Sequence, residues 1–174
     1  MCSKKQRGIG VIETMICLAV LGVLIMLGLQ PLVVWLQNRQ LRRSSDDMVE
    51  GVLIAHGEAI HRNLPVQISF GPGTGWTVRE VTSGAVIQMQ EGLPHAALTA
   101  LNGVPATTVT FDSLGGVAAN ADGSPSATKI DVTNPAGGAC QPSGAMRCLR
   151  LTISADGRPR VCDPLATSRH PRRC

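Results

Sequence analysis

The chain has 174 residues, of which 44% are hydrophobic, 16% charged and only 2% aromatic. This apolar content excludes a chain that is disordered along its whole length, and the scarcity of aromatic residues argues against a site that stacks bases or sugars on rings. The formal charge of +4 is uneven, because residues 140–174 hold seven arginines against two aspartates while residues 9–139 are net acidic, and such asymmetry indicates an interaction surface.

The N-terminal part predicts a short leader, residues 1–8, followed by a membrane-spanning helix over residues 9–36. The leader is polar and basic, and residues 14–29 carry no charge. A helix rises about 1.5 Å per residue, so residues 9–29 are long enough to cross a hydrocarbon layer of about 30 Å. The basic flank predicts that the rest of the chain lies outside the cytoplasm. A cleaved secretory signal is the alternative, but the apolar run is long for one and no small-residue cleavage site follows it.

Glu13 is the unusual residue of this apolar segment. A carboxylate inside a membrane helix costs about 2.5–3.5 kcal/mol on insertion scales, so it needs a partner. Cleavage after Gly8 would create a free amine on Ile9 and make Glu13 the fifth residue of the mature chain. We expect this positive terminus to pair with the Glu13 carboxylate, within one subunit or between neighbours.

This arrangement resembles the signature of type IV pilins and pseudopilins, which is a basic leader ending in glycine, an apolar first mature residue and a glutamate at the fifth. The residues that carry it are Lys4, Lys5, Gly8, Ile9 and Glu13. Gly10 departs from the small hydroxyl residue frequent at the second mature position. The resemblance implies cleavage and N-methylation of Ile9 by a prepilin peptidase, and assembly with other pilins or pseudopilins. It also implies that Glu13 neutralises the terminus of an adjacent subunit.

Residues 37–63 predict the amphipathic second half of the same helix. Apolar residues from Met48 to Ile60 recur at helical spacing. Pro31 predicts a kink rather than an end, whereas Ser44-Ser45 leave open whether one bent helix or two helices form. We expect the helix to end near Asn63.

Residues 64–174 predict a small antiparallel β domain of about six or seven strands. Short β-branched segments begin near residues 66, 76, 85, 108, 128 and 149, and Gly and Pro clusters separate them. The glycine-rich stretch over residues 70–76 lacks the Lys and Ser/Thr of a phosphate-binding loop and predicts a hairpin turn. We expect residues 114–127 to form a mobile surface loop.

The junction of helix and first strand is similar to that of the GspH/FimT pseudopilin family. The match is carried by Glu58, Ala59, Ile60, Arg62, Asn63 and Val66, with Gly75-Trp76 in the second strand. The resemblance implies an α+β, pilin-like fold. In it, a long N-terminal α-helix, transmembrane in its first half, packs on a small antiparallel β domain with a disulfide-stapled C-terminal loop.

We expect neither an enzyme nor a cofactor or metal site. The histidines His56, His61, His95 and His170 are widely separated, and no acid stands at a helpful metal-ligand spacing. No nucleophile elbow or Cys-His pairing is present in the sequence.

The basic C-terminal region, residues 140–174, contains a predicted hairpin with a turn at Asp156-Gly157. Arg150 is expected to face solvent on the outgoing strand. Arg158 and Arg160 lie two apart on the return strand, so they face one side about 6–7 Å apart. Pro159 cannot donate a ladder hydrogen bond, which predicts an edge strand.

The sequence GRPR over residues 157–160 resembles the GRxR motif of DNA-binding, FimT-like members of this family, which serve natural transformation. The resemblance implies that Arg158, Arg160 and a basic tail hold DNA without sequence preference. The candidate DNA-binding residues are Arg158, Arg160, Arg150, Arg169, Arg172 and Arg173. Two alternatives stay open: solvated charges without a ligand, or arginines that pair with acids of a neighbouring pilin.

Four cysteines, Cys140, Cys148, Cys162 and Cys174, lie in the last 35 residues and allow three disulfide pairings. We favour Cys140–Cys148 with Cys162–Cys174, because the second bond would close the arginine-bearing tail into a loop and lower its entropy loss on binding. In the rival pairing Cys148–Cys162, the turn places Cys162 opposite residues 150–151, out of register with Cys148.

The leading hypothesis is a minor type IV pilin that captures extracellular DNA for uptake. It would be a single-pass inner-membrane protein of a Gram-negative cell with a periplasmic domain, and would later join the filament. The alternative is a structural subunit without DNA binding, either a minor pseudopilin of type II secretion or a pilin that primes assembly.

Overall fold

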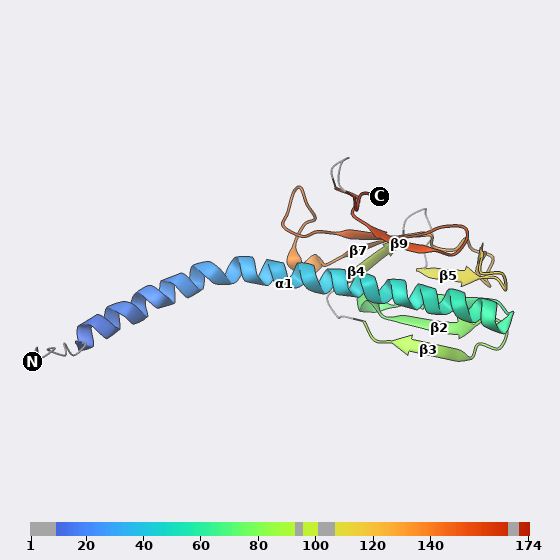
Figure 1. Cartoon of the computed structure of the whole chain (residues 1–174), viewed down its shortest axis with the longest axis horizontal. Coiled ribbons are helices and arrows are strands. Elements are labelled where there is room, and N and C mark those ends of the chain that lie inside the picture. Colours follow the sequence, from blue (N-terminus) through green and yellow to red (C-terminus); the bar gives the residue numbers. More distant parts are fainter. Residues whose placement is uncertain (1–9, 93–95, 101–106, 167–170) are drawn as a thin grey trace, which may run out of the picture. The chain divides into compact units, whose positions relative to one another are not determined.

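The computed structural model describes residues 10–92, 96–100, 107–166 and 171–174, and the chain divides into two compact units, residues 1–36 and 37–174. The leader residues, Gly8 and Ile9 lie outside the described residues. One α-helix, nine strands and two 3-10 turns make up the described elements (Figure 1). Their bounds are α1 Val11–Arg62, β1 Val66–Phe70, η1 Pro72–Thr74, β2 Trp76–Glu80, β3 Val86–Gln90, β4 Ala97–Ala100, β5 Thr108–Phe111, β6 Val117–Ala118, β7 Lys129–Thr133, η2 Pro135–Gly137, β8 Leu149–Ile153 and β9 Pro159–Cys162.

The first unit is the apolar part of α1. Large apolar side chains such as Leu18, Val23 and Leu24 are more than half exposed. An 18-residue window of the helix has a mean hydropathy of 2.5, so α1 is long and apolar enough to cross a membrane. Glu13 lies in the first turn of the helix, and its side chain is exposed.

The helix question that the sequence left open has one answer: α1 is a single helix that does not end at Pro31 or at Ser44-Ser45. Both serines are buried inside the second unit. The Ser45 hydroxyl donates a 3.0 Å hydrogen bond to the carbonyl of Leu41, one turn earlier. A serine bonded in this way does not interrupt the helix.

The helix ends beside Asn63, as expected. Asn63 takes a positive φ of 54°. Its amide donates to the Ile60 carbonyl at 3.3 Å, and the Leu64 amide donates to the Ala59 carbonyl at 3.3 Å. This pair of bonds is a Schellman motif, in which an asparagine in the left-handed region closes the last helical carbonyls. The reversal turns the chain directly into β1.

The strands form two antiparallel sheets. The order is β3-β2-β1-β5-β6 in the first sheet and β4-β7-β8-β9 in the second. The expectation of six or seven strands was too low, because β4 and the two-residue β6 were not recognised. The glycine-rich stretch is a hairpin connection from β1 to β2, and β9 is an edge strand; both were predicted.

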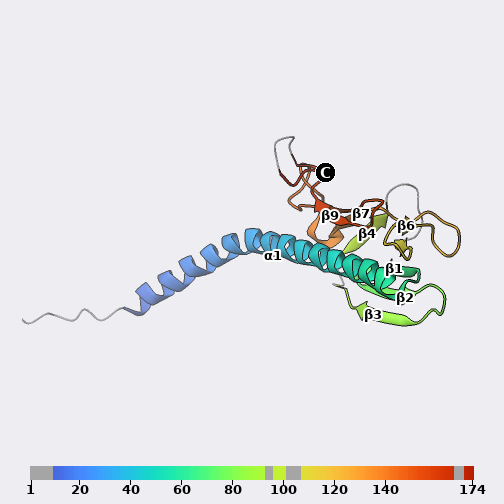
Figure 2. The same cartoon turned by 45° about the vertical axis from the view of Figure 1, so that its right-hand side comes forward.

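The core lies where the second half of α1 packs on the two sheets. Met48, Val52, Ala55 and Ala59 of the helix are fully buried, together with inward residues of β1, β2, β5, β7 and β8. Figures 1 and 2 show this part of α1 running beside strands of both sheets. Gly51 allows α1 to approach β2 closely, because a Cβ at this position would lie 2.7 Å from the Trp76 ring.

The expectation of a mobile surface loop over residues 114–127 was wrong for most of that segment. Asn120 and Ser126 are buried. The Thr110 hydroxyl donates to Asn120 at 2.9 Å, and the Thr110 amide donates to the Ser126 hydroxyl at 2.9 Å. Buried polar groups must be paired, and here the short polar side chains supply the partners. The polar composition of this segment predicted a loop, because composition does not reveal which side chains hydrogen-bond to one another.

The turn between β8 and β9 is held against the helix. The Gly157 amide donates to the Ser154 carbonyl at 2.9 Å, the Ser154 amide donates to the Arg158 carbonyl at 3.0 Å, and Gly157 has a φ of 80°. This is a type I turn followed by a glycine bulge. A Cβ on Gly157 would collide with the backbone carbonyl of Gly115 and with the His56 ring. Gly157 is therefore fixed by both its conformation and its neighbours.

We predict that Gly157→Ala destabilises the protein more than Gly123→Ala. Both glycines have a φ of 80°, but nothing lies within 4 Å of a Cβ on Gly123. Each alanine has the backbone strain of a positive φ, about 1 kcal/mol, and Gly157→Ala adds about 1–3 kcal/mol for overpacking. Thermal unfolding of the full chain in detergent measures the difference. Equal losses in the two variants would show that the contact with His56 and Gly115 is not restrictive.

Candidate nucleic-acid interface

Both favoured disulfides are present. Cys140 is bonded to Cys148 and Cys162 to Cys174, with Cα–Cα distances of 5.5 and 5.0 Å. The register of β8 and β9 places Cys162 opposite Arg150. The rival bond from Cys148 to Cys162 is therefore out of register, as predicted.

The second disulfide holds the C-terminal tail beside the edge strand β9. The Asp163 amide donates to the Arg172 carbonyl at 2.7 Å, and Asp163 forms a parallel bridge with Arg173. The Arg160 guanidinium donates to the Arg173 carbonyl at 3.4 Å. Arg160, Arg172 and Arg173 are all exposed. The fold thus brings together arginines that are up to 13 residues apart.

Arg158 stands at the turn that leads into β9. Its side chain is 84% exposed, and its Nε lies 3.0 Å from Asp156 Oδ2. The Ser154 hydroxyl donates to the Asp156 carboxylate, and this bond, followed by the charge of Arg158, lowers the pKa of Asp156. Asp156 is therefore anionic at neutral pH and opposes part of the positive charge of the turn.

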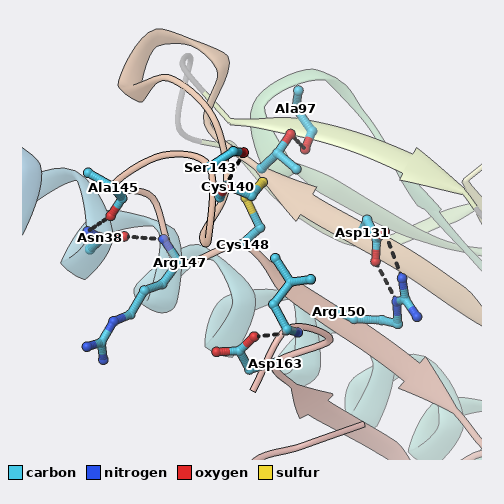
Figure 3. The surroundings of a disulfide bond; sticks show 12 residues. Asn38, Ala97, Asp131, Cys140, Ser143, Ala145, Arg147, Cys148, Arg150 and Asp163 are labelled. Carbon is cyan, nitrogen blue, oxygen red and sulfur yellow. Dashed lines mark hydrogen bonds and ion pairs between the residues drawn. A yellow bond between two sulfur atoms is a disulfide. The ribbon is translucent and has the colours of Figure 1, made fainter. Parts of the chain in front are cut away.

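Arg150 corrects one expectation, because it does not project freely into solvent. Its Nε and Nη2 donate to the two carboxylate oxygens of Asp131 at 2.6 and 3.0 Å, as Figure 3 shows. The Arg150 and Asp131 side chains are 26% and 24% exposed. The hydrogen bond that Arg150 donates to Asp131 raises the pKa of Arg150. A bidentate pair of this kind satisfies the guanidinium fork, so Arg150 is unsuited to hold a phosphate.

Lys129 is a basic residue that the sequence analysis missed. It pairs with Thr152 across β7 and β8, and Thr152 pairs with Arg160 across β8 and β9. Directly opposed residues of antiparallel strands point to the same face, so Lys129 and Arg160 share the outer face of this sheet. Both are exposed. The position of Lys129 beside Arg160 depends on the strand registers. The turn at Asp156-Gly157 predicts the register of β8 and β9, but nothing in the sequence predicts that of β7 and β8.

The exposed arginines that the structure gathers are Arg158, Arg160, Arg172 and Arg173, and with Lys129 they form what we call the basic edge. Arg169 lies outside the described residues. Planar guanidinium groups suit phosphate oxygens because each offers several donors in a fixed geometry. The basic edge can therefore bind a polyanion through its backbone charges.

Metal and acid-base chemistry have no support in the described residues. No group of three or more His, Cys, Asp or Glu side chains there could hold a metal ion. His56 is a packing residue whose ring meets Phe111 edge-on, with centroids 5.8 Å apart. His61 is exposed at the end of α1, and His95 and His170 lie outside the described residues.

Comparisons with solved structures find pilin-like neighbours. The type IV minor pilin FimU of Pseudomonas aeruginosa matches with a TM-score of 0.53 and 15% identity, over 71% of this chain and 88% of FimU. The minor pseudopilin EpsH of the Vibrio cholerae type 2 secretion system matches with a TM-score of 0.49 and 15% identity, over 73% of this chain and 99% of EpsH. No curated protein matches the chain at a significant level.

The sequence also matches the family model for the type II transport protein GspH over residues 44–157, which is more than half of the chain. The match spans α1 from residue 44 onward, strands β1 to β8 and the turn up to Gly157, and β9 lies outside it. Pilins and pseudopilins are structural subunits rather than enzymes. The chain therefore belongs to the GspH family, as a minor pilin or pseudopilin of the type IV pilus or type II secretion kind.

Proposed function

We propose that this protein is a FimT-like minor pilin that binds extracellular DNA without sequence preference, for uptake in natural transformation. The observation that carries the proposal is the basic edge, where Arg158, Arg160, Arg172 and Arg173 are exposed around one edge strand. A subunit that only fills a place in a filament has no evident need for net positive charge concentrated at one end of its sheet.

The chemistry of the basic edge favours phosphates over bases. Arg158 and Arg160 are two positions apart on an extended chain, which separates them by about 6–7 Å. That spacing suits successive phosphates of one strand, and phosphate contacts carry no sequence information. One subunit with so few contacts should bind in the nonspecific range, at a Kd of about 10⁻⁴–10⁻⁶ M. Several subunits, or a tip complex, would add avidity.

The same proposal includes processing and location. A prepilin peptidase would cut after Gly8 and methylate Ile9, and Glu13 would then pair with the new terminus. Before assembly, residues 9–36 would cross the inner membrane once, with the β domain in the periplasm. After assembly, the same segment would pack among other pilins in the filament.

A structural role without DNA is the second candidate, in a type II secretion pseudopilus or as an assembly-priming pilin. One observation favours it. Arg172 lines a pocket together with Arg42, Asp46 and Asp163, so a tail arginine already lies near acids of this chain. Arginines of this kind also suit acids on a neighbouring subunit.

We predict that Arg158→Gln/Arg160→Gln loses DNA binding. A gel-shift titration of the full chain in detergent against random-sequence duplex DNA, at several salt concentrations, measures this. Each phosphate contact contributes about 0.9 to the slope of log K against log salt, so the slope of the double variant should fall by roughly 2.

The matched control is Arg62→Gln/Arg79→Gln, which removes the same charge from exposed residues elsewhere in the fold. This control should bind DNA like the wild type. If the wild type fails to bind at low salt, or if the control loses as much as the test variant, the DNA proposal is wrong and the structural role is preferred.

Lys129→Gln tests whether the basic edge extends across the sheet. Because Lys129 faces the same side as Arg160, its loss should reduce the salt slope by about 1, with the fold unchanged. Arg79→Gln is the matched single control. An unchanged slope for Lys129→Gln would confine the DNA contacts to β9 and the tail.

Asp156→Asn should strengthen DNA binding. Asparagine suits the same turn position, but it removes the negative charge beside Arg158. Since the pKa of Asp156 is lowered, the wild-type carboxylate stays ionised above about pH 5. The difference between wild type and variant should therefore be the same at pH 6 as at pH 8, in the same titration. Weaker binding by the variant would mean that Asp156 orients Arg158 rather than opposing it.

A further inference from the structure

The start of the second unit carries two arginines that the DNA proposal does not use. Arg42 and Arg43 are exposed on α1, and Arg42 lines a pocket together with Asp46, Asp163 and Arg172. Within the described part of the chain, neither takes part in an ion pair. Their positive charge is therefore available to a partner outside the chain.

The first disulfide loop brings a third arginine to the same end of the domain. Asn38 of α1 donates to the Ala145 carbonyl at 3.2 Å and accepts from the Arg147 amide at 2.7 Å. Figure 3 shows this clamp, with the Arg147 side chain pointing away from it. The Cys140–Cys148 bond closes the loop. The backbone of Arg147 is thus fixed to Asn38, which lies one helical turn before Arg42, and the Arg147 side chain is exposed.

The sequence places these residues next to the expected membrane surface. Residues 14–38 contain no Asp, Glu, Lys or Arg, and 25 helical residues span about 37 Å. This exceeds a hydrocarbon core of about 30 Å but falls short of the 40–45 Å that includes the headgroups. Arg42 follows the run by four positions, about 6 Å of rise, within reach of a long arginine side chain toward the headgroups.

We propose that Arg42, Arg43 and Arg147 form a basic collar that binds anionic phospholipid headgroups while the protein is anchored in the membrane before assembly. The inference depends on the membrane-inserted state within the proposed function, but not on DNA binding. The collar would hold the β domain against the membrane surface.

The order of charges along α1 favours lipid over other polyanions. Three arginines, Arg39, Arg42 and Arg43, come first after the apolar run, and Asp46 and Asp47 follow one turn after the last two. An anionic surface at the end of the apolar run would attract the nearer arginines and repel the more distant acids. A free polyanion such as DNA gains nothing from this order, because it would approach both charges equally.

The experiment compares phospholipids directly. The full chain is reconstituted in nanodiscs of phosphatidylcholine, and spin-labelled phosphatidylglycerol or phosphatidylcholine is added in trace amounts. Electron paramagnetic resonance then gives the ratio of the two association constants. The test variant is Arg42→Gln/Arg43→Gln and the matched control is Arg62→Gln/Arg79→Gln, with Arg147→Gln as a separate single variant.

The wild type and the control should prefer phosphatidylglycerol. The test variant should lose roughly threefold or more of that preference, given the attraction of arginines near an anionic surface under screening by salt. Arg147→Gln should lose a smaller part. A wild type without preference, or a control that loses as much as the test variant, would overturn the collar.

A DNA titration of the same variants separates the two proposals. If Arg42→Gln/Arg43→Gln keeps its lipid preference but loses DNA, the collar belongs to the DNA interface and the lipid proposal is wrong. If only Arg158→Gln/Arg160→Gln loses DNA, and only the collar variant loses lipid preference, both proposals hold. A failure of DNA binding in the wild type leaves the lipid readout unaffected.

Discussion

The close packing of the second half of α1 on both sheets is the constraint on which the rest of the fold depends. Small residues make it possible: Ala55 and Ala59 are fully buried, and Gly51 lies against the face of Trp76. An interior packed to crystal-like density transmits any extra atom to its neighbours. Since α1 and both sheets share one buried core, the packing of the helix constrains where each sheet lies and where the β8–β9 turn can rest.

In the β8–β9 turn, the residues of the GRPR motif have different roles. The glycine of GRPR has a positive φ and lies on His56 and Gly115, so its role is structural. The Val117 amide donates to the Ala155 carbonyl at 3.0 Å, which ties the turn to β6 of the other sheet. Arg158 and Arg160 are then presented on a support that is fixed from two sides. An interface of exposed side chains gains from such a rigid base, because only the side chains must be ordered on binding.

Sequence reasoning predicted what depends on local pattern. The alternation of apolar residues identified six strands and the turn at Asp156-Gly157 a seventh. Pro159 indicated that this seventh strand is an edge, and the register from the turn favoured the observed disulfides over Cys148–Cys162. It missed what depends on pairing across the sheet. Arg150 looked like a ligand residue because Asp131 lies 19 residues away on another strand, and Lys129 went unnoticed for the same reason. The strand β6 has only two residues, too few to show the alternation of apolar and polar residues by which a strand is recognised.

The two disulfides do comparable work in neighbouring segments, since Cys162 lies opposite Arg150, two residues after Cys148. One closes a loop clamped to Asn38 and presents Arg147, and the other closes the tail on β9 and presents Arg172 and Arg173. Both loops are short, and their described residues form no named strand or helix, so without a covalent closure they would lose substantial backbone entropy when ordered. A small domain with few aromatic residues has little core to order them otherwise. The two disulfides therefore restrict the positions of arginines in the most basic part of the chain.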